Sequence, residues 1–260
     1  PQVADRVASG GSFFAALREQ AGVVPAHAER QIDVGQPTDA ERAVLLVCGR
    51  VESCIKYDEL SDELVQLGYA VYRFDHRGQG LSGRLLADHH KGHIDSYAAA
   101  VADLQQICSS IRPHHRQLFL LAHSMGGCIS ALLLQQANTP AITAAALCAP
   151  MVRLRSGPLP HWLAWLLVNL HHSLCQLWPS LRSAPPYFAR GGAYQDRPFA
   201  GNHISHSAVR YRLFRATMAA NPQAQLGDPT LAWVARSFRA AAAALAGAPR
   251  IRTPMLVLAA

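Results

Sequence analysis

The chain has 260 residues, of which half are hydrophobic, and its 24 basic residues outnumber its 17 acidic ones. That length suffices to bury a complete core and suits one large domain with an insertion better than two domains. No apolar stretch approaches the roughly 18 residues of a membrane-spanning helix, and no apolar leader is visible, so we expect neither a spanning segment nor an uncleaved signal peptide.

Short apolar runs alternate with helical patterns through the first 150 residues. We expect strands at 43–48, 69–75, 117–123 and 141–150, and helices at 57–67, 94–111 and 125–138. Near-continuous apolar strands separated by helices are typical of a parallel sheet that is covered on both faces. The pattern therefore predicts an α/β fold.

The alternation stops after Pro150, and the next strand-like run comes at 255–260. All four tryptophans, Trp162, Trp165, Trp178 and Trp233, fall in this interval, which opens with apolar residues at helical spacing in 161–170. We therefore predict an α/β core over 1–151, an inserted helical cap over 152–250 and a return to the core sheet at 251–260, with the remainder of the core beyond the chain.

Ser124 stands where the predicted strand 117–123 meets the helix that follows it. The segment from Ala122 to Gly126, Ala-His-Ser-Met-Gly, is the G-x-S-x-G pattern of a nucleophile elbow with alanine in the first glycine position. The strained turn requires small residues two before and two after the serine, and the helix N-terminus directs its dipole at Ser124. A serine that only caps the helix is the alternative, but the order of strand, turn and helix favours the nucleophile of an α/β-hydrolase.

A serine that accepts an acyl group needs two N–H donors for the oxyanion that develops on the substrate. One donor should be the backbone N–H of Met125, the residue after the nucleophile. The second should come from the loop 48–53, after the first predicted strand, where Gly49 permits a tight turn. We expect the backbone N–H of Arg50 to be this donor.

The serine also needs a base and an orienting acid, which follow it in chain order in this fold. No carboxylate occurs between Asp103 and Asp196, so the end of the strand 141–150 offers none. The later strand lies at 255–260. We therefore expect the Asp and the His of the triad beyond residue 260.

The histidines within the chain do not supply the base convincingly. We expect His123 to point to the other side of the elbow and to be structural. The remaining candidates are expected to lie in the cap (His203 and His206) or to be exposed or capping residues (His114, His115, His171 and His172).

One run is more specific than the elbow: Asp-His-Arg-Gly-Gln-Gly-Leu-Ser-Gly-Arg at 75–84. Together with Leu-Leu-Ala-Asp at 85–88, Gly-His at 92–93 and the segment 121–127, it closely resembles bacterial lysophospholipases of type L-two, which are relatives of the monoglyceride lipases. The loop 49–53, Tyr57 and Ala-Pro-Met at 149–151 fit the same family. The resemblance covers residues 20–155 well and the predicted cap loosely.

The resemblance implies a serine carboxylic-ester hydrolase that removes the acyl chain of a lysophospholipid through an acyl-enzyme on Ser124, and acyl transfer to another lipid alcohol would use the same intermediate. Asp75, Arg77 and Ser82 are expected to build a structured loop. The alternatives are a monoacylglycerol lipase, a peptidase on the same scaffold, or a non-catalytic lipid-binding relative.

The distribution of charge along the chain indicates which kind of partner it contacts. Residues 104–260 hold two carboxylates against fourteen arginines, a field that suits an anionic membrane surface or, without a partner, a solvated basic face. No nucleic-acid motif accompanies the arginines.

The six cysteines form no C-x-x-C pair and no zinc-ligand spacing. We expect a cytoplasmic protein at the inner membrane, without metal, cofactor or nucleic acid; the sequence does not indicate its oligomeric state.

Overall fold

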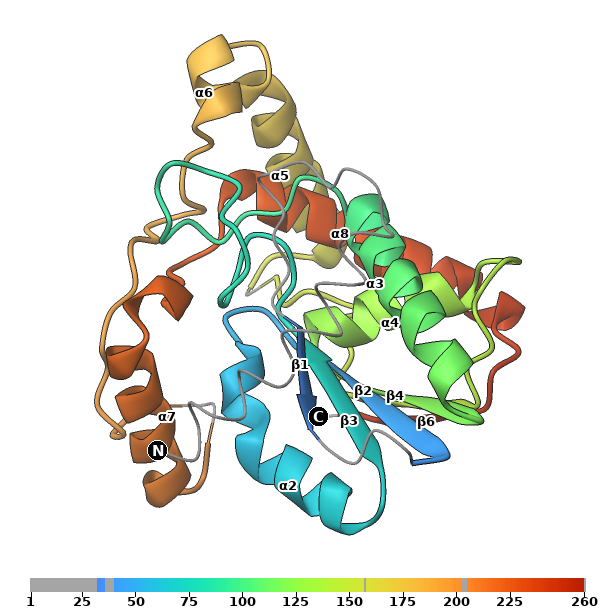
Figure 1. The fold of residues 1–260 in the computed structure, drawn as a ribbon. Helices are drawn as coiled ribbons and strands as arrows, with labels where there is room; N and C mark the ends of the chain where they lie inside the picture. Colours follow the sequence, from blue (N-terminus) through green and yellow to red (C-terminus); the bar gives the residue numbers. More distant parts are fainter. Residues whose placement is uncertain (1–31, 36–39, 157, 203–204, 260) are drawn as a thin grey trace.

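The centre of the molecule is a mostly parallel sheet. The structure is a computed structural model and describes residues 32–35, 40–156, 158–202 and 205–259. The strands are β1 (Ile32–Gly35), β2 (Arg42–Val47), β3 (Ala70–Phe74), β4 (Gln117–His123), β5 (Ala144–Cys148) and β6 (Met255–Leu258). Their order in the sheet is β1-β3-β2-β4-β5-β6. β1 is antiparallel to β3 and every other neighbouring pair is parallel, so the expected sheet is confirmed (Figure 1).

Helices cover both faces of the sheet (Figure 1). The helices of the core are α2 (Asp58–Gln66), α3 (Tyr97–Ile111), α4 (Met125–Leu134) and α8 (Leu231–Gly247). α2 packs over Val44, Leu46 and Val71 on one face, whereas α3, α4 and α8 share the larger core on the other. Short 3-10 turns are η1 (Cys54–Tyr57), η2 (Arg112–His114), η3 (Pro222–Ala224) and η4 (Ala248–Arg250).

Two predicted helices are shorter than the apolar pattern indicated, and polar side chains explain both. α3 begins at Tyr97 instead of residue 94, because the Ser96 side chain accepts hydrogen bonds from the backbone N–H groups of Ala98 and Ala99. α4 ends at Leu134 instead of residue 138. The Thr139 hydroxyl donates to the carbonyl of Leu133 at 2.7 Å, and such side-chain bonds satisfy carbonyls that a longer helix would use.

Four helices follow β5: α5 (His161–Cys175), α6 (Pro179–Ser183), α7 (Ala208–Ala220) and then α8. α5 packs against α8, and α8 packs against α3 and α4. By its contacts, α8 therefore belongs to the helical layer of the sheet, although it falls within the predicted cap range 152–250. The division of the chain into core and cap remains a prediction, and residues 1–31 of the predicted core lie outside the described residues.

All six cysteines are free thiols. Five are buried, and Cys148, at the end of β5, is partly exposed. Burial raises the pKa of the Cys108 and Cys128 thiols to about 12, so both stay protonated at neutral pH. Within the described ranges, no helix has the length and apolar composition that a membrane crossing requires.

Candidate active site

Ser124 lies at the turn between β4 and α4 in a strained backbone conformation, with φ of 50° and ψ of −114°. A non-glycine residue with positive φ is uncommon and persists where its surroundings hold it. Three backbone hydrogen bonds do so: the N–H of Ser124 donates to Cys148 O at 3.0 Å, and its carbonyl accepts from Cys128 at 3.1 Å and Met151 at 2.9 Å. The half-buried serine is thus fixed at the end of the sheet.

The residues around Ser124 have to be small because backbone atoms press against them. A Cβ atom on Gly126 would lie 2.3 Å from the carbonyl oxygen of Val47, and one on Gly127 would lie 2.8 Å from Pro150. Ala122 is buried between β2 and β5, opposite Val47 and Leu147. These contacts bring the start of α4 against the end of β2, as an elbow requires.

The loop after β2 reaches Ser124. A Cβ on Gly49 would lie 3.2 Å from the Cβ of Ser124 and 3.0 Å from Nδ1 of His123, so the loop backbone passes directly beside the serine. Val51, two residues on, has a positive φ of 61°. The Gly49 N–H donates to Glu52 at 2.6 Å and is therefore engaged within the loop. The oxyanion roles expected for the N–H groups of Arg50 and Met125 remain predictions.

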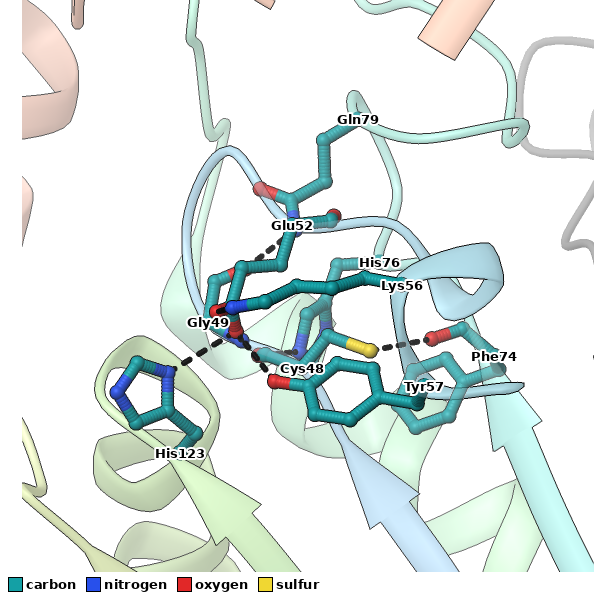
Figure 2. A network of polar contacts seen from close by, with 9 residues as sticks. All are labelled: Cys48, Gly49, Glu52, Lys56, Tyr57, Phe74, His76, Gln79 and His123. Carbon is teal, nitrogen blue, oxygen red and sulfur yellow. Dashed lines mark hydrogen bonds and ion pairs between the residues drawn. The ribbon is translucent and has the colours of Figure 1, made fainter. Parts of the chain in front are cut away.

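Glu52 accepts from four donors in a network that no local sequence pattern predicts (Figure 2). Its carboxylate accepts from the Gly49 N–H at 2.6 Å, from the Tyr57 hydroxyl at 2.6 Å and from Nδ1 of His123 at 3.0 Å, and it pairs with Lys56. Because His123 precedes Ser124 directly, Glu52 links the loop after β2 to the residue next to the serine.

Electrostatics keep Glu52 ionised. Burial alone would raise the pKa of its carboxyl, but the hydrogen bond from His123 and the charge of Lys56 outweigh burial and hold the pKa well below its ordinary value. Burial and the neighbouring Glu52 charge raise the pKa of Tyr57, so the phenol stays protonated and donates. The carboxylate is therefore a fixed acceptor at neutral pH.

Two carbonyl groups at the start of the same loop accept hydrogen bonds from the segment after β3 (Figure 2). Nε2 of Gln79 donates to the Gly49 carbonyl at 2.7 Å. Nε2 of His76 lies 3.0 Å from the Cys48 carbonyl, and burial lowers the pKa of His76 to about 4. The neutral ring therefore carries its proton on Nε2 and donates it to that carbonyl.

The sequence of this chain matches the model of the family described as "Serine aminopeptidase, S33" over residues 38–260. The match spans strands β2 to β6, the serine turn and the helices that the structure describes. This chain belongs to the serine aminopeptidase S33 family.

Curated relatives show similarity along most of the chain. The S33-family chain is 39% identical to "Lysophospholipase L2" of Escherichia coli (strain K12) over 220 residues, 84% of this chain and 62% of the relative. It is 31% identical to "Probable lysophospholipase L2" of Haemophilus influenzae over 227 residues, 86% of this chain and 68% of the relative. The predicted resemblance is confirmed, and the chain spans less than two thirds of the Escherichia coli protein.

The fold also matches that of a monoacylglycerol lipase from Paleococcus ferrophilus, with a TM-score of 0.60 at 21% identity over 88% of this chain and 76% of that one. At that identity the likeness concerns the fold alone. Together with the sheet order and the serine turn, it confirms the predicted α/β-hydrolase fold.

The run at 75–84 builds a structured loop in this S33-family chain, as predicted. The buried carboxylate of Asp75 accepts from the Ser53 hydroxyl at 2.8 Å and from the N–H groups of Cys54 and Leu81, both at 2.7 Å. Gly80 has a φ of +57° and approaches so closely that a Cβ there would lie 2.1 Å from the Asp75 carboxyl carbon. A longer side chain at Gly80 would displace Asp75 and the loop that it anchors.

The prediction of exposed or capping histidines holds at His115, which is the C-cap of η2, and is wrong at His172. His115 is buried, because its ring bonds the Tyr72 hydroxyl at 2.7 Å and the Ala40 carbonyl at 2.6 Å. His172 is buried on the inner side of α5, where burial lowers its pKa. His203 lies outside the described residues, and the expected acid and base beyond residue 260 remain predictions.

His123 does not point away from the site region. Its side chain is 44% exposed and contacts Glu52 through Nδ1, which gives it a structural partner next to the serine. The described residues contain no group of three His, Cys, Asp or Glu side chains that could hold a metal ion.

A small cavity of about 160 Å³ adjoins the loop after β2 and is rich in arginine. Arg50 and Val51 line it from the loop, and Arg197, Arg215 and Asp228 line it from the segment after α6. The Nε of Arg215 is buried and has no hydrogen-bond partner among the described residues. A larger depression of about 710 Å³ is lined by the far end of α4 at Gln135 and Gln136, away from Ser124.

Proposed function

We propose that this protein is a serine carboxylic-ester hydrolase that removes the fatty acyl chain from lysophospholipids. The observation that carries the proposal is Ser124, held at positive φ between β4 and α4 beside the Gly49 loop. The 39% identity to "Lysophospholipase L2" of Escherichia coli supports a lysophospholipid over a peptide or a neutral glyceride as the substrate.

The mechanism uses Ser124 as the nucleophile. Its Oγ attacks the ester carbonyl while its proton passes to the base, the histidine expected beyond residue 260. The N–H groups of Met125 and Arg50 stabilise the oxyanion. The ester C–O bond then breaks, the glycerophospho alcohol leaves with the proton, and a water molecule releases the fatty acid from the acyl-enzyme. A lipid alcohol in place of water would give acyl transfer.

The arginine-rich cavity beside the loop is suited to the phosphate of the head group. Arg50, Arg197 and Arg215 line it together with one carboxylate, Asp228. Guanidinium N–H groups donate charge-assisted hydrogen bonds to phosphate. One terminal nitrogen of Arg215 pairs with Asp196 and bonds the Gln195 carbonyl, whereas its buried Nε–H has no partner among the described residues. The hydroxyl groups of a neutral monoacylglycerol could accept from this donor but carry no charge, and a charge-assisted hydrogen bond to phosphate is stronger, which favours the charged substrate over the glyceride alternative.

We further propose that the enzyme works in the cytoplasm at the anionic surface of the inner membrane. The basic excess of residues 104–260 supports such a contact, because anionic head groups attract clustered arginines. No metal or cofactor is needed for the proposed reaction.

The test is fatty-acid release by the full-length gene product from a lysophospholipid and from the monoacylglycerol with the same chain. We expect faster release from the lysophospholipid. A preference for the glyceride would make the protein a monoacylglycerol lipase, and no release from either would support the non-catalytic lipid-binding alternative.

The cavity makes a sharper prediction about head-group selection. Changing Arg215 to glutamine is expected to raise KM for the lysophospholipid about tenfold, because one charge-assisted hydrogen bond contributes about 1.5–3 kcal/mol. KM for the monoacylglycerol should stay unchanged. The control is Arg210→Gln on the same helix, whose side chain pairs with Glu59 on the surface. Equal effects on both lipids would remove Arg215 from head-group binding.

A further inference from the structure

An apolar face is exposed along α5 and the connection from α5 to α6. It consists of Trp162, Trp165, Leu166, Leu170, Leu177 and Trp178, whose side chains are between 40% and 71% exposed. We call these six residues the α5–α6 face. Figure 1 shows α6 and the adjoining end of α5 projecting beyond the rest of the molecule.

The face is not the side of α5 that stabilises the fold. Ala164, Val168 and Cys175 are the buried apolar positions of α5, and this helix packs on α8. Leu166 and Leu170 lie four residues apart on the outer side. A surface helix ordinarily presents polar residues there, and contiguous exposed apolar patches mark interaction sites.

The charged side chains around the face favour an anionic partner. No carboxylate occurs between Asp103 and Asp196, so α5, α6 and their connections carry no negative side chain. Exposed arginines flank the face: Arg153 and Arg155 precede α5, and Arg182 lies on α6. Beyond α6, Asp88 accepts from the Tyr187 hydroxyl and Asp228 accepts from the Gly192 N–H. Both contacts lie outside the α5–α6 face.

We propose that the α5–α6 face inserts into the interfacial layer of an anionic phospholipid bilayer. The leucines enter the acyl region, the three tryptophans lie at the level of the head groups, and the flanking arginines contact lipid phosphates. A second copy of the chain is the poorer occupant, because it would bring the same arginines face to face. The inference rests on the proposed function for its choice of lipid, and its test is independent of turnover.

The experiment measures binding to vesicles by the full-length gene product carrying Ser124→Ala, so that no lipid is cleaved. The vesicles contain phosphatidylcholine alone, or phosphatidylcholine and phosphatidylglycerol in equal parts. We expect the Ser124→Ala protein to bind the anionic vesicles. Adding Leu166→Ser and Leu170→Ser should weaken its partition into these vesicles at least about tenfold, because two apolar side chains no longer enter the acyl region. The matched control pair is Leu67→Ser and Leu245→Ser, two leucines that are 66% and 53% exposed elsewhere.

Tryptophan emission reports the depth of insertion. Lipids with brominated acyl chains should quench Trp162, Trp165 and Trp178, whereas Trp233, which is 8% exposed in the core, should keep its emission. Equal loss of binding in both leucine pairs, or no quenching, would overturn the proposal. A dimer that the Leu166 and Leu170 changes dissociate, without vesicle binding, would instead assign the face to a second copy.

A separate assay keeps this inference apart from the proposed function. The Leu166 and Leu170 changes, made in the protein with Ser124, should leave hydrolysis of a water-soluble short-chain ester unchanged. In the protein that keeps both leucines, ester hydrolysis with no vesicle binding by its Ser124→Ala form would refute the membrane face and keep the esterase. Vesicle binding without ester hydrolysis would refute the esterase and keep the membrane face.

Discussion

Replacing Ser124 with alanine is expected to lower ester hydrolysis by at least about 10⁴-fold, because a nucleophilic serine and its partners act as one unit. The fold should survive. The Ser124 side chain makes no capping hydrogen bond, and alanine meets the same backbone strain at positive φ. The measurement is kcat for a lysophospholipid in the full-length gene product, with the melting temperature as a check of folding.

Ser130 provides the matched control for this change. It lies on the same helix, and its buried hydroxyl has no hydrogen-bond partner among the described residues. Ser130→Ala should therefore retain activity and stability. A phosphonate probe that reacts with activated serines should label the unmodified protein and the Ser130 variant, but not the Ser124 variant. Full turnover by a folded Ser124→Ala protein would remove Ser124 from the mechanism.

Replacing Glu52 with glutamine is expected to reduce both stability and turnover. Glu52 is buried and accepts from Gly49, Tyr57 and His123 while pairing with Lys56. The amide keeps the shape but removes the charge. Because Lys56 and His123 are 39% and 44% exposed, solvent screens both pairs, and the expected loss in the free energy of unfolding is about 1–3 kcal/mol. Because the loop beside Ser124 would shift, kcat should fall by about 10- to 100-fold, whereas KM should change little.

The stability change should depend on pH in a defined direction. The pKa of Glu52 is lowered in the folded protein, so its contribution is fully present above the ordinary glutamate value of about 4.3 and is lost as pH falls toward the folded pKa. Urea unfolding should therefore separate the Glu52→Gln protein from the unmodified one at neutral pH, and the gap should narrow below about pH 4.

The control for Glu52 is Glu59→Gln, because Glu59 is exposed and pairs with Arg210 on the surface. Exposed ion pairs contribute little, so this change should leave kcat unaffected. A Glu52→Gln protein with the same stability profile and kcat as the Glu59 control would show that the buried network does not position the loop.

The elements nearest the site were predictable because each depends on local sequence. β4 begins and ends where the apolar run 117–123 does, and α4 starts directly after Ser124 because Gly126 and Gly127 allow close packing. Helix ends that are fixed by side-chain capping were harder to predict from the sequence. The pattern of apolar residues extended α3 to residue 94, whereas the hydroxyl of Ser96 fixes its start at Tyr97.

The Glu52 network could not be read from local sequence, because Glu52 and His123 are 71 positions apart. The order of the strands in the sheet does, however, indicate that these two residues are close. β2 and β4 are adjacent and parallel, with Val47 opposite Ala122, so the loops after these strands meet at one edge of the sheet. A carboxylate five positions past β2 and a histidine at the end of β4 are then neighbours. The burial of His115 and His172 likewise depends on tertiary packing.

The position of Cys148 bears on how inhibition of this protein should be interpreted. Cys148 is the partly exposed cysteine at the end of β5, and its carbonyl accepts the backbone N–H of Ser124. Alkylation or mercury binding at this thiol would displace the turn that holds Ser124. The buried thiols with raised pKa values react poorly with such reagents. Inactivation by a thiol reagent would then result from damage to a neighbouring strand end, and it would be no evidence for a cysteine protease-like nucleophile.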